Sequence, residues 1–311
     1  MTREGTELAD GPSKLLEDLL LKTSRTFALS IPRLPQPTRH EVGVAYLLFR
    51  IADTLEDATR WDPKRQIEAL GEFSRLLEQP QDAAAADLGR RWTADPPLLH
   101  EGYLELLSEL SAVMRAFSAL APRARELVGH HTLRTIERMT GFVERARVEG
   151  RLQLIDVAEL KDYCYAVAGI VGEMLTELFL LRRECLQPVA TELRRHASIF
   201  GEALQLVNIL KDSATDVDEG RRYLPPDVDA SDVLDLAHRD LDAAREYVLA
   251  LQSSGAERGL VEFAALPVLL AHATLDRVRK HGSGSKLSRL EVAAIVRRLG
   301  KALNEDLPAI P

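Results

Sequence analysis

Apolar residues recur along the chain mostly three and four positions apart, which is the period of an amphipathic helix rather than of a half-buried strand. Leu, Ala, Arg and Glu are abundant, and aromatic residues make up only 5% of the 311 residues. Residues of these abundant types favour helices. We therefore predict an all-α protein with helices over residues 12–31, 38–59, 63–78, 99–120, 122–149, 156–185, 188–217, 231–253, 257–280 and 286–304.

Stretches rich in proline, glycine and polar residues separate these helices. The prolines of "IPRLPQPT" deny helical hydrogen bonds, and "EGRRYLPPDVDASD" is a second break, after which Ser231 or Asp232 can cap the next helix. "HGSGSKLSR" predicts a mobile loop, and "QPQDAAAADLGRRWTADPP" predicts an irregular surface connection. The chain has no repeat at a fixed period, which argues against a solenoid. We expect a flexible N-terminus over residues 1–11 and one compact domain over residues 12–311.

The composition is that of an ordinary soluble globular protein, with 46% hydrophobic and 28% charged residues. A net charge of −8 argues against nucleic-acid binding, which needs clustered Lys and Arg. Two cysteines, Cys164 and Cys185, are too few for a disulfide framework and predict a reduced, cytoplasmic setting. The N-terminus lacks the apolar core of a signal peptide, and Pro267 and His272 interrupt the longest apolar run, "FAALPVLLAHATL". We expect no integral membrane segment and at most peripheral membrane contact.

Two acidic clusters follow apolar runs. In "RIADTLEDATR", Asp53, Glu56 and Asp57 fall at helical spacings directly behind "VGVAYLLF". Like charges at these spacings destabilise a helix by about 0.2–0.5 kcal/mol per pair, so a positive partner should lie opposite them. In "FGEALQLVNILKDSATDVDEGRRYLP", Asp212 and Asp216 are four residues apart at the end of a second apolar helix.

The second cluster extends a polar stripe. Gln205, Asn208 and Asp212 lie about one turn apart on an otherwise apolar helix, and burying such a stripe is costly without partners. Acidic residues at helical spacing usually form a solvated face. Two clusters behind apolar runs instead suggest that at least four carboxylates converge on one cavity, where they would suit Mg²⁺ completed by substrate phosphates. From the residues alone, both interpretations stay open.

Other catalytic or metal motifs are missing. A di-iron carboxylate bundle needs Glu-x-x-His motifs, and the chain has none. His130 and His131 lack a carboxylate at that spacing and are interpreted as packing or surface residues. The sequence also contains no Gly-rich phosphate loop and no nucleophile elbow.

With both acidic clusters placed, the chain resembles the squalene/phytoene synthase family of head-to-head prenyl synthases, and its squalene-type members most. "SRTFALSIPRLP" is similar to the first conserved block and "YLLFRIADTLED" to the first aspartate-rich motif. "YCYAVAGIVGEMLTELF" is similar to the central helix, and "GEALQLVNILKDSATDVDEGRRYLP" to the second aspartate-rich motif with its following loop. Four ordered blocks over most of the chain make the resemblance specific. It implies a single-domain, all-α isoprenoid-synthase fold around a central apolar cavity.

The resemblance also implies a role for each matching residue. The Mg²⁺ ligands would be Asp53, Glu56, Asp57, Asp212 and Asp216. The diphosphate contacts would be Ser24, Arg25, Arg50, Lys211, Arg221 and Tyr223, supported by Gln205 and Asn208. Tyr46 and Tyr163 would line the reacting centre and, with Arg50 and the aspartates, form the catalytic set.

Some of these positions depart from the family or have simpler interpretations. Lys211 stands where the family more often has arginine, and lysine lacks the planar bidentate fork of arginine. Ser24 could simply form a local hydrogen bond, and Tyr46 could be a core aromatic residue.

The activity implied by the resemblance is condensation of two farnesyl diphosphates, through presqualene diphosphate, to the C30 hydrocarbon squalene or dehydrosqualene. NADPH would supply the hydride for squalene. Lys286 and Arg289 are candidate contacts for its phosphate, although a solvated basic loop is the simpler interpretation. "DTLED" and "FAALPVLLAHATL" followed by "KLSR" look more like squalene-type members than like phytoene synthases.

Three alternatives follow from the same resemblance. The chain could be a phytoene synthase that uses geranylgeranyl diphosphate, or a terpene cyclase of the same fold. A non-catalytic assembly factor of the same fold is an alternative of another class, but such a role would tolerate lost acidic residues, and here both motifs are intact.

Overall fold

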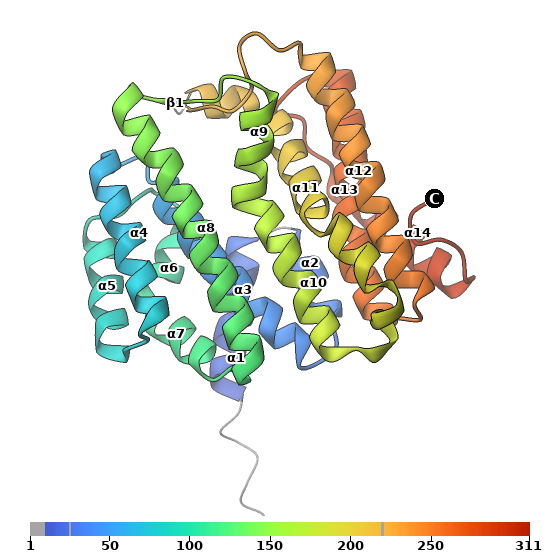
Figure 1. Ribbon diagram of the computed structural model, residues 1–311, viewed down its shortest axis with the longest axis horizontal. Coiled ribbons are helices and arrows are strands. Elements are labelled where there is room, and N and C mark those ends of the chain that lie inside the picture. The colour runs from blue at the N-terminus through green and yellow to red at the C-terminus, as the bar shows by residue number, and fades with distance from the viewer. Residues whose placement is uncertain (1–9, 25, 219–220) are drawn as a thin grey trace, which may run out of the picture.

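The computed structural model describes residues 10–24, 26–218 and 221–311, which are mainly helical (Figure 1). The prediction of an all-α fold is confirmed. Within these ranges the only strands are the two-residue β1 (Leu152–Gln153) and β2 (Arg221–Arg222), which pair in parallel. Helix α1 already begins at Asp10, and residues 1–9 of the expected flexible N-terminus lie outside the described residues.

Most helices lie close to their predicted ranges. They are α1 (Asp10–Thr23), α2 (Phe27–Ser30), α3 (Thr38–Glu56), α4 (Pro63–Glu78), α5 (Asp82–Ala94), α6 (Glu101–Ser108), α7 (Leu110–Ser118), α8 (Pro122–Glu149), α9 (Val157–Cys164), α10 (Ile170–Arg182), α11 (Ala190–Asp218), α12 (Ala230–Ser253), α13 (Arg258–His281) and α14 (Arg289–Asn304). Two short 3-10 turns, η1 (Ile31–Arg33) and η3 (Glu184–Val189), and a π-helical turn, η2 (Tyr165–Gly169), complete the set.

Local hydrogen bonds and backbone breaks divide three of the predicted helices. The helix predicted over residues 12–31 ends at Thr23, because the Ser24 hydroxyl accepts a hydrogen bond from the Phe27 N–H at 2.9 Å and α2 begins at Phe27. The helix predicted over residues 99–120 divides at Glu109 into α6 and α7. The helix predicted over residues 156–185 contains η2 between α9 and α10. The cap of α12 was also predicted wrongly, since the Asp229 carboxylate accepts from the Ser231 N–H.

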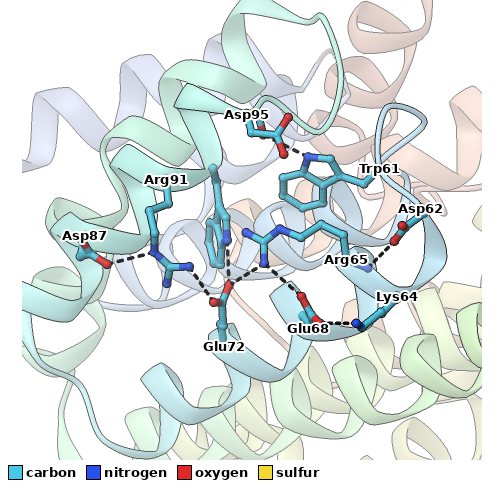
Figure 2. A network of polar contacts seen from close by, with 10 residues as sticks. Trp61, Asp62, Lys64, Arg65, Glu68, Glu72, Asp87, Arg91 and Asp95 are labelled. Carbon is cyan, nitrogen blue, oxygen red and sulfur yellow. Dashed lines mark hydrogen bonds and ion pairs between the residues drawn. The ribbon is translucent and has the colours of Figure 1, made fainter.

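The prediction of an irregular connection over residues 79–97 is wrong, because α5 forms there. Its apolar face is short and consists mainly of Ala85, Leu88 and Trp92. Trp92 is fully buried and packs edge-on against Phe73 of α4. Glu72 of α4 accepts hydrogen bonds from Arg91 Nη1 at 2.8 Å and from Trp92 Nε1 at 3.1 Å (Figure 2). Arg65 Nη1 adds a third donor at 3.3 Å. These tertiary contacts stabilise the helix.

Replacing Glu72 with Gln is expected to destabilise the fold by about 1 kcal/mol at neutral pH. Burial would raise the pKa of Glu72, but hydrogen bonds from Arg91 and Trp92 and the nearby arginine charges hold it below its ordinary value. A depressed pKa stabilises the fold above the unfolded pKa, about 4.3, and this stabilisation is lost as the pH falls through the folded pKa. The difference in free energy of unfolding between the two proteins should therefore shrink in acid, as chemical denaturation at several pH values would measure.

Glu68→Gln is the matched control. Glu68 lies one turn earlier on α4 and is more exposed, and its ion pairs with Lys64 and Arg65 span 3.9 and 4.0 Å (Figure 2). Such surface pairs contribute little. An equal loss of stability in both variants would contradict a special role for Glu72.

The helices form a layered bundle. Neighbours in the series α5, α4, α8, α10, α11 and α12 pack against each other, and they follow this order from left to right in Figure 1. Helix α3 packs against α1, α4, α6, α7, α8 and α10. Most buried apolar side chains of the described residues belong to one contiguous core cluster. This core holds α3 opposite α10 and α11, which position the candidate site.

Two apolar segments, Val157–Arg182 and Arg258–His281, are long and apolar enough to cross a membrane by length and composition alone. In each case 61% of the apolar window is buried within the bundle, which is the pattern of a core helix.

Candidate active site

A cavity lies between α3, the η2–α10 segment and α11, where the sequence predicted an apolar cavity. Residues of α2, η1 and α13 also contribute to its wall. The lining is mostly apolar and includes Phe27, Val42, Met174, Leu175, Phe200 and Phe263.

The polar residues of this cavity gather at one end. On α3 the lining changes from Val42 to Arg50 and Asp53 toward the C-terminus, and on α11 it changes from Phe200 to Asn208 in the same direction. Arg221, three residues after α11, forms an ion pair with Asp57, the residue that follows α3. The C-terminal ends of both helices therefore lie together, so the cavity has an apolar floor and a polar mouth. Such a cavity suits a ligand with a long apolar chain and a charged head.

The wall formed by α10 and α11 depends on glycine. A Cβ built on Gly172 would lie 1.9 Å from the Ala197 carbonyl oxygen, and one on Gly201 would lie 2.0 Å from the Ala168 carbonyl oxygen. The two backbones therefore approach closely, which only glycine permits. The π-helical turn η2 is part of the same wall, where π turns often accompany functional sites.

Arg50 lies at the mouth with its charge partly compensated. Its Nη1 is 3.4 Å from Asp53 Oδ2, and its Nε donates to the Tyr46 hydroxyl at 3.3 Å. Burial alone would lower the pKa of Arg50, but Asp53, Tyr46 and Tyr103 raise it above its ordinary value. Burial raises the pKa of Asp53, and the Arg50 charge opposes this effect.

The remainder of the first acidic cluster faces Arg221. This arginine forms an ion pair with Asp57, and β2, to which it belongs, pairs with β1. Glu56 is buried, and burial raises the pKa of its carboxyl group to about 7 even though the Arg221 charge opposes the change. Glu56, Asp57 and Arg221 line a hollow separate from the central cavity.

Two tyrosines lie between the acidic clusters. Tyr163 donates a hydrogen bond to the Tyr223 hydroxyl at 3.1 Å, and the two rings stack with centroids 4.7 Å apart. Burial raises the pKa of both phenols. Tyr223 also lines a small hollow with Asp216. Tyr163, predicted to line the reacting centre, is buried beside Glu56 and Tyr223 and is not among the residues lining the central cavity.

The second acidic cluster also has a basic partner. Lys211 Nζ is 3.0 Å from Asp212 Oδ2 and donates to Asn208 Oδ1 at 3.4 Å. Gln205 and Asn208 line the central cavity, as a polar stripe facing a ligand would require. Asp212 does not line it, and its carboxylate lies beside Lys211.

The N-terminal site residues make local contacts. The Ser24 hydroxyl accepts from the Phe27 N–H, which is the simpler role considered for it. Tyr46 lines the cavity and donates from its hydroxyl to the Thr23 carbonyl at 2.8 Å. Arg25 lies outside the described residues.

The two candidate NADPH contacts lie near the second acidic cluster. The Gly284 N–H donates to the Lys211 carbonyl at 2.6 Å, which places the α13–α14 loop beside the end of α11. The Lys286 carbonyl accepts from Arg277 Nη1 at 3.0 Å, and Arg289 is exposed at the start of α14. Neither side chain lines the central cavity.

The carboxylates fit Mg²⁺ in chemistry but are not gathered into one cluster. No group of three His, Cys, Asp or Glu side chains within residues 10–24, 26–218 and 221–311 is arranged to hold a metal ion. Three carboxylates are instead paired with basic side chains: Asp53 with Arg50, Asp57 with Arg221 and Asp212 with Lys211. Carboxylate oxygens are the ligands that Mg²⁺ prefers.

Tyr103, Gly172 and Gly201 were missed from the sequence. Tyr103 lies in α6, and its ring centroid is 5.5 Å from the Arg50 guanidinium carbon. No spacing or motif distinguishes it from other helix residues. The two glycines resemble the helical glycines elsewhere in the chain until the partner backbone is seen.

Comparisons with known proteins find squalene synthases among the relatives of this chain. The squalene synthase of Eremothecium gossypii is 28% identical over 280 residues, which cover 84% of this chain and 60% of that protein. The squalene synthase of Yarrowia lipolytica is 30% identical over 228 residues, covering 73% of this chain and 47% of that protein. The chain thus spans about half the length of these curated relatives.

Solved structures share the fold. TcSQS in complex with the ligand E5700 has a TM-score of 0.78 at 23% identity, covering 93% of this chain and 86% of that one. A dehydrosqualene synthase in complex with a ligand has a TM-score of 0.60 at 19% identity, covering 94% and 98%. The fold is therefore the all-α fold of these synthases.

The family is decided by a match over most of the chain. A family model described as squalene/phytoene synthase matches residues 20–295, which contain both acidic clusters and every wall of the cavity. Because the match extends far beyond the aspartate-rich motifs, this chain belongs to the squalene/phytoene synthase family.

Proposed function

We propose that this protein condenses two farnesyl diphosphates head to head, through presqualene diphosphate, to a C30 hydrocarbon. The observation that carries the proposal is the cavity with an apolar floor and a polar end where Arg50 pairs with Asp53. The curated squalene synthases among its relatives support the same activity.

The ion pairs near the C-terminal ends of α3 and α11 would separate when substrate binds. Arg50, Lys211 and Arg221 would turn toward the diphosphate groups, with Ser24, Arg25 and Tyr223 nearby in the sequence-based assignment. The acidic residues of the two clusters would hold Mg²⁺: Asp53, Glu56, Asp57, Asp212 and Asp216. Bound Mg²⁺ supplies positive charge that stabilises the departing diphosphate.

In the first half-reaction the C1–O bond of one farnesyl diphosphate breaks, and its electron pair leaves with the diphosphate. The double bond of the second molecule attacks the allylic cation, and loss of a proton closes a cyclopropane, giving presqualene diphosphate. The Phe27 and Tyr46 rings lie 5.6 Å apart on the cavity wall, where an aromatic ring can stabilise a cation. The apolar wall excludes water, which would otherwise quench the cation.

In the second half-reaction the remaining diphosphate leaves and the carbon skeleton rearranges. Hydride transfer from NADPH would give squalene, and loss of a proton would give dehydrosqualene. Lys286 and Arg289 are outside the lining of the central cavity, so we assign them no step.

The cavity must widen to hold two substrates. It encloses about 160 Å³, whereas ligand pockets typically measure about 300–1,000 Å³. We propose that side chains on the wall shift as the prenyl chains enter. We further propose that the protein is cytoplasmic. We expect transient contact with a membrane, because a C30 hydrocarbon is insoluble in water.

Incubating the purified protein with farnesyl or geranylgeranyl diphosphate tests this function. Reactions with and without Mg²⁺ and NADPH would be followed by diphosphate release and by mass analysis of the hydrocarbon. We expect a C30 product from farnesyl diphosphate that requires Mg²⁺, with NADPH separating squalene from dehydrosqualene. A C40 product alone, or no product, would contradict the proposal.

A further inference from the structure

The Arg50 guanidinium contacts a second aromatic ring besides that of Tyr46. The ring centroid of Tyr103 is 5.5 Å from its central carbon, and that of Tyr46 is 5.6 Å away. A cation this close to an aromatic face is attracted by the ring quadrupole. Tyr103 is half-buried and belongs to α6, far from both acidic clusters in the sequence.

The fold holds the Tyr103 ring in this position. A Cβ on the preceding residue, Gly102, would lie 2.6 Å from the Lys22 carbonyl oxygen, so α6 sits directly on the end of α1. Lys22 Nζ pairs with Glu105 at 2.7 Å across the same contact. The His100 ring stacks on Tyr103 at 4.0 Å, and His100 Nδ1 accepts from the Tyr103 N–H at 3.3 Å. The ring is therefore positioned by the contact of α6 with α1 and by the cap residue of its own helix.

The same end of α1 also holds the other ring. Tyr46 donates to the carbonyl of Thr23, which immediately follows Lys22. The last turn of α1 therefore helps to position both aromatic side chains that contact Arg50.

An aromatic ring holds an arginine side chain in a different way from a carboxylate partner. The hydrogen bond and ion pair of Arg50 use Nε, toward Tyr46, and Nη1, toward Asp53. If Asp53 turned to a metal ion, the ion pair would be lost, whereas the contact with Tyr103 would remain. A cation–π contact uses the face of the guanidinium and leaves its N–H edge available to an anion.

We propose that Tyr103 is a positioning residue that holds the Arg50 guanidinium at the cavity mouth with its N–H edge toward the substrate diphosphate. This inference rests on the proposed function. It assigns Tyr103 a part in binding an anion without contact between Tyr103 and that anion.

The test measures binding of inorganic diphosphate, with Mg²⁺ present, by calorimetry and by inhibition of farnesyl diphosphate turnover. Tyr103→Leu should weaken diphosphate binding by roughly 5- to 30-fold, the range of a partly desolvated cation–π contact. Tyr103→Phe keeps the ring face and should restore binding to within about twofold of wild type. Tyr103→Met is a second variant without the ring, for use if the leucine variant folds poorly by thermal denaturation.

A double-mutant cycle shows whether the effect passes through Arg50. In an Arg50→Gln background the guanidinium is gone, so Tyr103→Leu should weaken diphosphate binding no further. Unchanged binding in the leucine and methionine variants would overturn the inference, as would an equal loss in the Arg50→Gln background. If the wild-type protein makes the C30 product and either of these contrary outcomes is observed, only the inference about Tyr103 fails. A wild-type protein without turnover or diphosphate binding contradicts the proposed function itself.

Discussion

Replacing Asp53 or Asp212 with Asn is expected to slow diphosphate release from farnesyl diphosphate by roughly 10²- to 10³-fold. Asparagine keeps the shape and one oxygen of aspartate but loses the charge that binds a divalent cation. The Mg²⁺ concentration for half-maximal rate should also rise, by roughly 10- to 100-fold. Steady-state kinetics over a Mg²⁺ titration would measure both effects.

The two positions test different parts of the site. Asp53 lines the cavity and is 3.4 Å from Arg50, so it needs little movement to face a bound head group. Asp212 lies beside Lys211 and must turn toward the mouth. A slow Asp53→Asn variant with a normal Asp212→Asn variant would show that the second cluster is a solvated surface.

Asp87→Asn is the control for these variants. Asp87 is an exposed residue of α5 whose carboxylate accepts from Arg91 Nε at 3.0 Å (Figure 2). It does not line the cavity. This variant should retain wild-type turnover and the same Mg²⁺ dependence. If all three variants were equally slow, loss of charge in general would explain the result, and the metal assignment would be wrong.

Gly201→Ala should lower the free energy of unfolding by about 3 kcal/mol. Its added Cβ would lie 2.0 Å from the carbonyl oxygen of Ala168, which belongs to backbone that cannot move without separating α11 from the η2–α10 segment. Both segments line the cavity, so turnover should fall together with stability. Chemical denaturation and kinetics on the same preparation would measure the two losses.

Gly141→Ala is the matched control in a second long helix. A Cβ on Gly141, in α8, meets no atom within 4 Å. Alanine should therefore stabilise the protein by about 0.5–1 kcal/mol through its higher helix propensity. Destabilisation of both variants by the same amount would mean that the close contact of α10 with α11 has no special cost.

The helices that the sequence predicted well are those with strong local signals. Pro63 and Pro122 occupy the first turn of α4 and α8, and both helices have the predicted bounds. The acidic clusters were likewise visible because carboxylates behind apolar runs violate the usual pattern of a solvated helix. Helix α5 was missed because buried Trp92 and its bond to Glu72 depend on a neighbouring helix.

The sequence by itself determined the all-α class, the two acidic clusters and the family, since helical periodicity and ordered motifs are properties of the chain. Only the tertiary structure decided which charges meet. It paired Asp57 with Arg221, 164 residues away, and brought the Tyr103 ring to Arg50. It also distinguished Gly201 from Gly141, because a glycine's importance depends on the atom its missing Cβ would strike. Such contacts join residues distant along the chain, and no local spacing encodes them.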